Sequence, residues 1–206
     1  MKYILMCGGD YGSIPKHLTK INGEELIART IRLLRAEGVE DIAISTHYPV
    51  FEKFGLPILE HDNSFNALLG SGYWIDAFYP MEEPACYIFG DVFFSPEAIH
   101  TIVTTETDSV EFFASAPPYA PEYPKPWAEP FAFKVADQKH FRDSIRQTKF
   151  LCDTVQFKRH PLAWELWQVV KGTPINHIDY TNYTVINDYT CDIDDDTQID
   201  QWRNKL

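Results

Sequence analysis

The sequence predicts a single α/β domain, with helices on both faces of a mainly parallel sheet. Short apolar runs alternate along the chain with longer amphipathic patterns, which is the order of strands and helices in such domains. The first apolar run, the first helical pattern and the second apolar run together form a βαβ unit of about 45 residues. A chain of 206 residues, 45% of them hydrophobic, is long enough to bury one core without disulfides or a structural metal.

The first 115 residues carry most of the predicted sheet. Apolar runs that are too short for helices predict strands over 2–7, 41–46, 57–60, 86–89 and 110–115. Helical patterns lie between them, over 24–37, 66–78 and 96–105. In the first of these helices Ile27, Ile31 and Leu34 share one face, and Gly38 follows as a left-handed cap. Ser95 is the expected N-cap of the third helix.

The second half begins with an irregular segment. Six of the 14 prolines fall between residues 116 and 130, which excludes an interior strand or helix there, and such long loops in compact domains are usually functional. Trp164 and Trp167, on one predicted helix, suit either a homodimer face or a core. The predicted elements are a strand over 131–135, helices over 137–148 and 161–171, extended segments at 175–179 and 183–186, and a helix from about residue 195.

Composition excludes several classes of protein. The chain has 18 Lys and Arg against 30 Asp and Glu, a formal charge of −12, which argues against a nucleic-acid partner. No apolar run reaches the roughly 18 residues of a membrane span, and the apolar run near the N-terminus is too short for a signal peptide. The cysteines form no C-x-x-C pair. We therefore expect reduced thiols, no membrane association and a cytoplasmic location.

The loop after the first strand is one candidate site. Residues 8–16 read G-G-D-Y-G-S-I-P-K, and glycines in this place let the backbone approach a phosphate, to which Lys16 adds a positive charge. The loop is neither a P-loop nor the dinucleotide-binding G-x-G-x-x-G. An ordinary turn that requires glycine accounts for these residues equally well, so the loop alone leaves phosphate binding open.

Carboxylates form a second candidate site. Asp91 follows the strand 86–89, at the edge of the sheet where open α/β proteins bind ligands. Because Ser95 is the better cap for the next helix, Asp91 is available as a metal ligand. An acidic run at 192–196, with Asp200 beyond it, can cap the last helix, face solvent or contribute to a Mg²⁺ site together with substrate phosphates.

Six short stretches spread along the chain form a recognisable pattern. They are I-L-M-C-G-G at 4–9, P-K-H-L at 15–18, I-N-G-E-E-L-I-A-R-T at 21–30, G-V-E-D-I at 38–42, F-G-D-V at 89–92 and C-D-I-D-D at 191–195. Together they resemble the GT-A-like nucleotidyltransferase superfamily, which includes sugar-phosphate and choline-phosphate nucleotidyltransferases. The resemblance spans the chain and is strongest over the first 45 residues and at Asp91. It implies a three-layer α/β/α, Rossmann-like fold with a mixed sheet, in which 1–115 form the nucleotide-binding half and 116–206 form the acceptor-binding half and a metal-binding C-terminal segment.

Carried over residue by residue, the resemblance implies a complete site. Lys16, Asp91 and Asp194 would be catalytic, and the two carboxylates would bind Mg²⁺ or Mn²⁺. The nucleotide would lie against Gly8, Gly9, Gly12 and Lys16, with Ser71 and Gly72 near its base.

Three residues of the second half are candidates for binding the acceptor. Trp127 and Glu129 would offer it an aromatic face and a carboxylate, or else pack the proline-rich segment onto the sheet. Lys134 lies within the strand 131–135 and either faces solvent or reaches an acceptor phosphate, as a late lysine does in the family.

The implied activity is transfer of a nucleoside monophosphate, CMP by preference, from a nucleoside triphosphate to a phosphorylated sugar or alcohol, with release of pyrophosphate. One alternative is a GT-A glycosyltransferase, although residues 91–93 supply only one Asp of the D-x-D motif. The other is a non-catalytic nucleotide-sugar-binding protein. It is favoured by the lack of Arg between residues 10 and 14, where the family has one that grips the β- and γ-phosphates.

Overall fold

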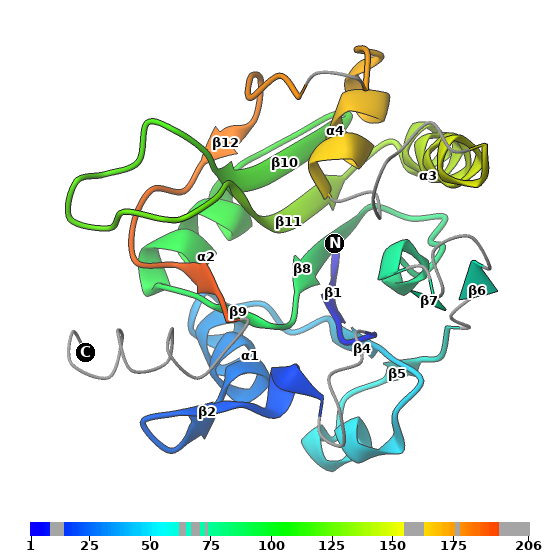
Figure 1. Cartoon of the computed structure of the whole chain (residues 1–206). Coiled ribbons are helices and arrows are strands. Elements are labelled where there is room, and N and C mark those ends of the chain that lie inside the picture. The colour runs from blue at the N-terminus through cyan, green and yellow to red at the C-terminus, as the bar shows by residue number, and fades with distance from the viewer. Residues whose placement is uncertain are drawn as a thin grey trace.

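A central sheet organises the chain (Figure 1). The computed structural model describes residues 1–8, 15–61, 65–66, 71–72, 74–154, 163–175 and 178–193, with only the backbone described at 65, 66, 71, 72 and 74. Seven described strands lie in the order β12-β10-β11-β8-β1-β4-β5. They are β1 (Lys2–Met6), β4 (Ile42–Ser45), β5 (Ile58–Leu59), β8 (Ala85–Phe89), β10 (Val110–Ser115), β11 (Glu129–Val135) and β12 (Thr184–Val185).

The direction of β11 decides which strand ends meet. This strand is antiparallel to both of its neighbours, β8 and β10, whereas every other pairing in the sheet is parallel. The carboxyl ends of β1, β4, β8 and β10 therefore share one edge, where ligands bind in open α/β sheets.

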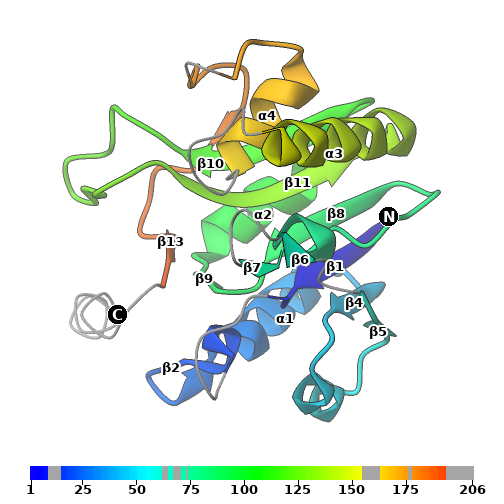
Figure 2. The same ribbon diagram turned by 45° about the vertical axis from the view of Figure 1, so that its right-hand side comes forward.

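Helices cover both faces, which gives the three layers that the sequence predicts (Figure 2). On one face, α1 (Leu26–Ala36), α2 (Pro96–Thr104) and the 3₁₀ helix η2 (Pro49–Phe54) pack on the sheet. On the other, α3 (Gln138–Asp153), α4 (Ala163–Lys171) and the 3₁₀ helix η3 (Trp74–Ala77) do so. Among the described residues no helix is both long enough and apolar enough to cross a membrane.

Local sequence signals explain the ends of α1 and α2. Ile27, Ile31 and Leu34 on α1 are buried against the sheet, and Gly38 has a φ of 80°, the left-handed conformation of a helix C-cap. The Ser95 hydroxyl accepts a hydrogen bond from the Ala98 amide at 2.9 Å, which confirms it as the N-cap of α2.

Short strand pairs connect the main elements. The first, β2 (Lys20–Ile21) with β3 (Glu24–Glu25), turns through Asn22 and Gly23, both at positive φ. Near the site, η1 (Lys16–Leu18) follows Pro15. The other pairs are β6 (Phe65–Asn66) with β7 (Ser71–Gly72), and β9 (Val92–Phe93) with β13 (Cys191–Asp192).

The structure corrects the predicted helix at 66–78. Residues 65–66 and 71–72 pair as strands, and only η3 is helical. Gly70 and Gly72 explain the difference, because each glycine costs about 1 kcal/mol relative to alanine inside a helix.

Other boundaries shift by a few residues. The first helix begins at Leu26 because 24–25 pair with 20–21, β11 begins at Glu129, and α3 continues to Asp153. Residues 175 and 178–179 are not in a strand. Trp164 and Trp167 are 3% and 4% exposed and belong to the core of this chain. The predicted helix from residue 195 lies outside the described residues.

Candidate active site

Three charged side chains meet at the carboxyl edge of the sheet. The Lys16 ammonium lies 2.5 Å from Asp91 Oδ2 and 3.5 Å from Asp192 Oδ1. All three side chains are mostly buried, with exposed fractions of 15%, 17% and 23%. Because both oxygens contact one nitrogen, they lie at most about 6 Å apart. One cation thus holds two carboxylates together.

Gly90 allows Asp91 to lie close to β1. The Gly90 amide donates to the Met6 carbonyl at 3.1 Å, as β8 ends beside β1. A Cβ at position 90 would lie 2.7 Å from both the Met6 carbonyl oxygen and Cys7 Sγ. Since backbone cannot yield as a flexible side chain does, glycine is required at this close approach.

Asp192 reaches the site through the pairing of β13 with β9. Asp192 lies opposite Val92 in this antiparallel pair, and the Ile193 amide donates to the Asp91 carbonyl at 3.2 Å. A residue about a hundred positions along the chain is thereby fixed beside Asp91. From the sequence, Asp192 is only one member of the acidic run, and the predicted metal ligand is Asp194, which lies outside the described residues.

Lys16 and His17 enter the site on η1. The His17 ring is 2% exposed and packs edge-on against Phe51, with ring centroids 5.8 Å apart. Burial lowers the pKa of His17 to about 4, which outweighs the opposite effect of Asp91, so the ring is neutral at pH 7. Burial alone would raise the pKa of Asp91, but the Lys16 ammonium holds it below its usual value, so this carboxylate stays charged.

The start of the glycine loop is anchored to the neighbouring strands. Thr46 Oγ1 donates to the Cys7 carbonyl at 2.8 Å, and Ser45 Oγ contacts His61 Nδ1 at 2.9 Å and the Ala77 carbonyl at 2.8 Å. A Cβ at Gly8 would lie 2.6 Å from His61 Nε2. Gly8 therefore lies close to the His61 ring, and its contact with a nucleotide stays a prediction.

The structure describes less of the other residues that are predicted to bind the nucleotide. Gly9 and Gly12 lie outside the described residues. Ser71 and Gly72 form β7, whose backbone pairs with β6 in a small hairpin. Their proximity to a base stays a prediction.

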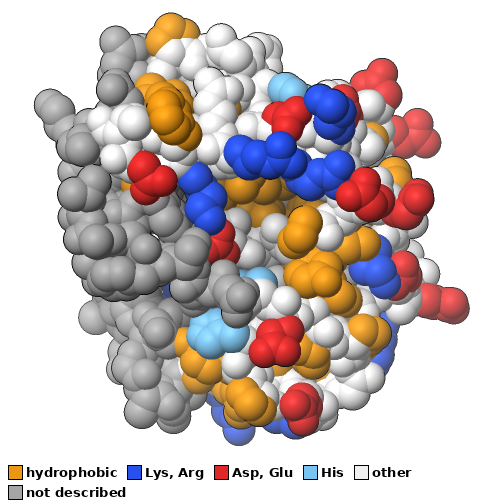
Figure 3. All heavy atoms as spheres, turned by 90° about the vertical axis from the view of Figure 1, so that its right-hand side faces the viewer, with side chains coloured by type: hydrophobic (Ala, Val, Ile, Leu, Met, Phe, Trp, Pro, Cys, Tyr) orange, Lys and Arg blue, Asp and Glu red, His pale blue; other side chains and the backbone are white. Residues whose placement is uncertain are grey.

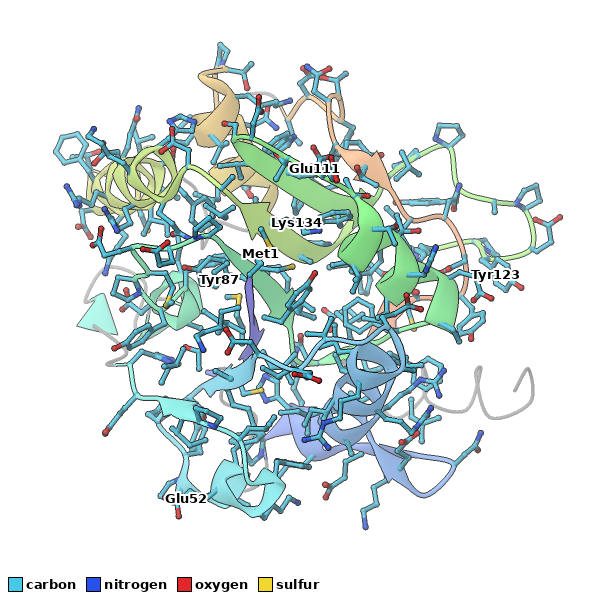
Figure 4. The ribbon with its side chains drawn as sticks, turned by 180° about the vertical axis from the view of Figure 1, so that it is seen from behind. Met1, Glu52, Tyr87, Glu111, Tyr123 and Lys134 are labelled. Carbon is cyan, nitrogen blue, oxygen red and sulfur yellow. The ribbon has the colours of Figure 1, made fainter. Side chains whose placement is uncertain are left out.

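Two of the three acceptor candidates, Glu129 and Lys134, are buried and contact other groups of this chain. Glu129 is 2% exposed and pairs with Lys125 at 2.9 Å, and Lys125 also donates to the Thr190 carbonyl. Lys134, labelled in Figure 4, is 5% exposed. Its ammonium donates to the carbonyls at the C-terminal end of α2, those of Ile102, Val103 and Thr105, at 2.9, 2.9 and 2.5 Å.

These contacts explain why buried charges are tolerated there. Lys134 satisfies carbonyls that α2 leaves unpaired and lies at the negative end of the helix dipole. Burial lowers the pKa of Lys134. Trp127 differs from both, since half of its surface is exposed. Of the three, Trp127 alone has an exposed side chain, and contact of any of them with an acceptor stays a prediction.

The carboxylates fit a hard divalent cation. Mg²⁺ prefers oxygen ligands and commonly takes one or two protein carboxylates together with substrate phosphates. Asp91 and Asp192 supply such a pair and already surround one positive charge. In the described part of the chain no group of three or more His, Cys, Asp or Glu side chains could hold a metal, so phosphates or residues beyond 193 would have to complete the ligand set.

The four cysteines are buried and unpaired with one another. No disulfide joins any two of Cys7, Cys86, Cys152 and Cys191. Burial raises the pKa of Cys7 and Cys86, which keeps both thiols protonated.

Solved structures of similar architecture include nucleotidyltransferases. A Bacillus anthracis protein described as a glucose-1-phosphate thymidylyltransferase matches with a TM-score of 0.59 and 14% identity, over 99% of this chain and 94% of that one. The 4-diphosphocytidyl-2C-methyl-D-erythritol synthase from Anaerococcus prevotii gives 0.58 and 13%, over 99% and 96%. The CTP:phosphocholine cytidylyltransferase from Streptococcus pneumoniae gives 0.55 and 14%, over 99% and 98%.

These likenesses settle the fold. The chain has the GT-A-like nucleotidyltransferase fold, as its sequence resemblance predicts. No protein-family model and no curated protein matches the sequence.

Proposed function

We propose that this chain is a nucleotidyltransferase that transfers a nucleoside monophosphate to a phosphorylated small molecule. The observation that carries the proposal is the contact of Lys16 with Asp91 and Asp192 at the carboxyl edge of a GT-A-like nucleotidyltransferase fold. Lys16 follows the glycine loop that begins at Gly8 after β1, and Asp91 follows β8, the strand that pairs with β1.

The reaction needs no nucleophilic side chain. An oxygen of the acceptor phosphate attacks the α-phosphorus of the nucleoside triphosphate and forms a new phosphorus–oxygen bond. The bond from the α-phosphorus to the bridging oxygen breaks, and pyrophosphate leaves with the electron pair. Catalysis therefore consists of positioning and charge stabilisation.

Each residue of the site has a part in this scheme. Lys16 supplies positive charge to the phosphates as negative charge develops. Asp91 and Asp192 would hold Mg²⁺ or Mn²⁺, together with Asp194 as the resemblance implies. The bound ion would neutralise phosphate charge and act as a Lewis acid. The backbone at Gly8 and the loop after it would approach the phosphates.

The finer assignments are part of the same proposal. We propose CTP as the nucleotide and a phosphorylated alcohol or sugar as the acceptor, because the chain's sequence resembles the cytidylyltransferase branch. Trp127, on the proline-rich segment, is the proposed acceptor contact. A Trp127→Ala variant should raise the KM for the acceptor more than the KM for the nucleotide. A larger change in the nucleotide KM would remove Trp127 from the acceptor site.

A pyrophosphate-release assay tests the proposal. The chain is incubated with Mg²⁺, each of the four nucleoside triphosphates, and pooled sugar phosphates or phosphocholine. We expect release that requires an acceptor and falls at least about 100-fold in Lys16→Ala, since removing one preorganised charge-stabilising group typically costs that much. Lys53→Ala, at an exposed lysine paired with Glu25, is the matched control.

The assay also separates the alternatives. Release of a nucleoside diphosphate from a nucleotide sugar would instead indicate a GT-A glycosyltransferase. Nucleotide-sugar binding without turnover of any substrate pair would indicate a binding protein, in keeping with the missing loop arginine.

A further inference from the structure

A groove of about 560 Å³ lies on the sheet face that carries α3 and η3. It runs between these two helices, and Figure 3 shows this side of the molecule. Lys16, Asp91 and Asp192 are not among its lining residues. The proposed reaction therefore leaves the groove unexplained.

The lengths of the two helices explain why the face is hollowed here. Helix α3 has 16 residues and extends for about 24 Å at the α-helical rise. The four residues of η3 extend for only about 8 Å at the 3₁₀ rise. The groove lies between α3 and this much shorter element, and its lining includes Pro80 beyond the end of η3.

Its floor is aromatic and fixed in place. Phe78, Tyr87 and Phe141 are all buried in the core, with ring centroids 5.2 to 5.7 Å apart. The hydroxyl of Tyr87, labelled in Figure 4, donates to the Tyr79 carbonyl at 2.8 Å, which orients the ring. Because these three rings are at most 4% exposed, the apolar surface that a ligand can touch comes from Tyr79 and Ile145, which are partly exposed above them. Preformed apolar surface on a fixed base is typical of small-molecule sites.

The rim on the α3 side is cationic. Arg142, Arg146 and Lys149 follow one another at spacings of four and three residues, so they share a face of α3. Figure 3 shows Lys and Arg side chains in a row above hydrophobic ones. This row stands out in a chain whose formal charge is −12.

Arg146 is the member of the row that is held least tightly. Arg142 contacts the Met81 carbonyl and Glu82, and Lys149 contacts Asp76 at 2.6 Å. Within the described part of the chain, Arg146 forms an ion pair only with Asp143 on its own helix, at 3.2 Å, and its side chain is 73% exposed. Exposed pairs of this kind contribute little, so the guanidinium can turn to a ligand at small cost.

We propose that this groove binds a small amphipathic anion. Its apolar body, aromatic or branched, would lie against Tyr79, Pro80 and Ile145, above the buried aromatic rings. Its one carboxylate, phosphate or sulfonate would pair with Arg146. A volume of about 560 Å³ falls in the range of small-molecule sites and does not admit a folded partner. Guanidinium groups suit such oxyanions because they bind them in a forked, two-bond geometry.

Fluorescence titration with anilinonaphthalene sulfonate tests this proposal on the full chain. The probe has an aromatic body and a sulfonate, and its emission rises in apolar surroundings. We expect saturable binding of one probe per chain, weakened about tenfold or more by Arg146→Glu. Lys139→Glu is the matched control, because Lys139 lies on the same helix, is 84% exposed and does not line the groove. Its affinity should stay within about twofold of wild type.

Two further measurements keep the test decisive. Ile145→Trp should fill the groove and abolish probe binding. If the larger side chain disturbs folding, Arg146→Glu still tests the proposal, because position 146 is exposed. The neutral N-phenylnaphthylamine should bind more weakly, with no response to Arg146→Glu. Equal effects of the Arg146 and Lys139 variants, or equal affinity for the neutral probe, would overturn the proposal. Because no nucleotide is present, the result is independent of the proposed transferase activity.

Discussion

Replacing Lys16 by Met tests whether this lysine is the counterion that holds the two carboxylates together. Methionine keeps an unbranched side chain but removes the charge, which leaves Asp91 and Asp192 with oxygens at most about 6 Å apart. Breaking a fully buried ion pair costs about 3–5 kcal/mol. These side chains are 15% to 23% exposed, so water screens part of the effect, and we expect the free energy of unfolding to fall by about 2–3 kcal/mol.

Urea denaturation with and without millimolar Mg²⁺ is the assay. In Lys16→Met the ion should recover about 1 kcal/mol or more, because it binds the folded state and replaces the lost cation. In the wild type, where Lys16 already pairs with both carboxylates, Mg²⁺ alone should change stability little. Adding Asp91→Asn to Lys16→Met should also recover stability, by removing one of the repelling charges.

The control is Lys53→Met, which removes an exposed lysine paired with Glu25 at 2.8 Å and should cost no more than about 0.5 kcal/mol. If Lys16→Met is as stable as the wild type, or if Mg²⁺ stabilises both proteins equally, Lys16 is not the counterion of this site.

Three further predictions concern residues around the site. Glu129→Gln should lower the free energy of unfolding by about 3 kcal/mol, because it leaves the buried Lys125 ammonium without its carboxylate. Adding Lys125→Met should restore part of the lost stability, whereas additive losses in urea denaturation would contradict the pairing. The free energy of unfolding should fall by on the order of 3 kcal/mol as the pH drops from about 6.5 to about 4, because in this range His17 is protonated only in the unfolded state. An equally steep pH dependence of the free energy of unfolding in His17→Leu would refute this prediction. Gly90→Ala should lower the melting temperature more than Ala28→Gly does, since its Cβ meets the Met6 carbonyl at 2.7 Å, and an unchanged melting temperature would show that β1 and β8 can separate.

Elements whose signals are local can be predicted from the amino-acid sequence alone. The stripe of Ile27, Ile31 and Leu34 and the glycine at 38 predicted α1, and Ser95 predicted the start of α2, because these signals operate within one or two helical turns. The apolar runs predicted the main strands for the same reason. Their alternation with helices, together with the family resemblance, predicted the three-layer fold that the structure confirms.

The partners of the charged residues become apparent only in the folded chain. The sequence predicts Lys16 and Asp91 as site residues, but the contact of Lys16 with Asp192 depends on β13 pairing with β9. Glu129 and Lys134 are acceptor candidates from the sequence, and the structure adds that Glu129 pairs with Lys125 and that Lys134 contacts the end of α2. Their contact with an acceptor stays a prediction. Hydrophobic periodicity reports which face of an element is buried, whereas the partner of a buried charge is set by segments that are distant in sequence and adjacent only after folding.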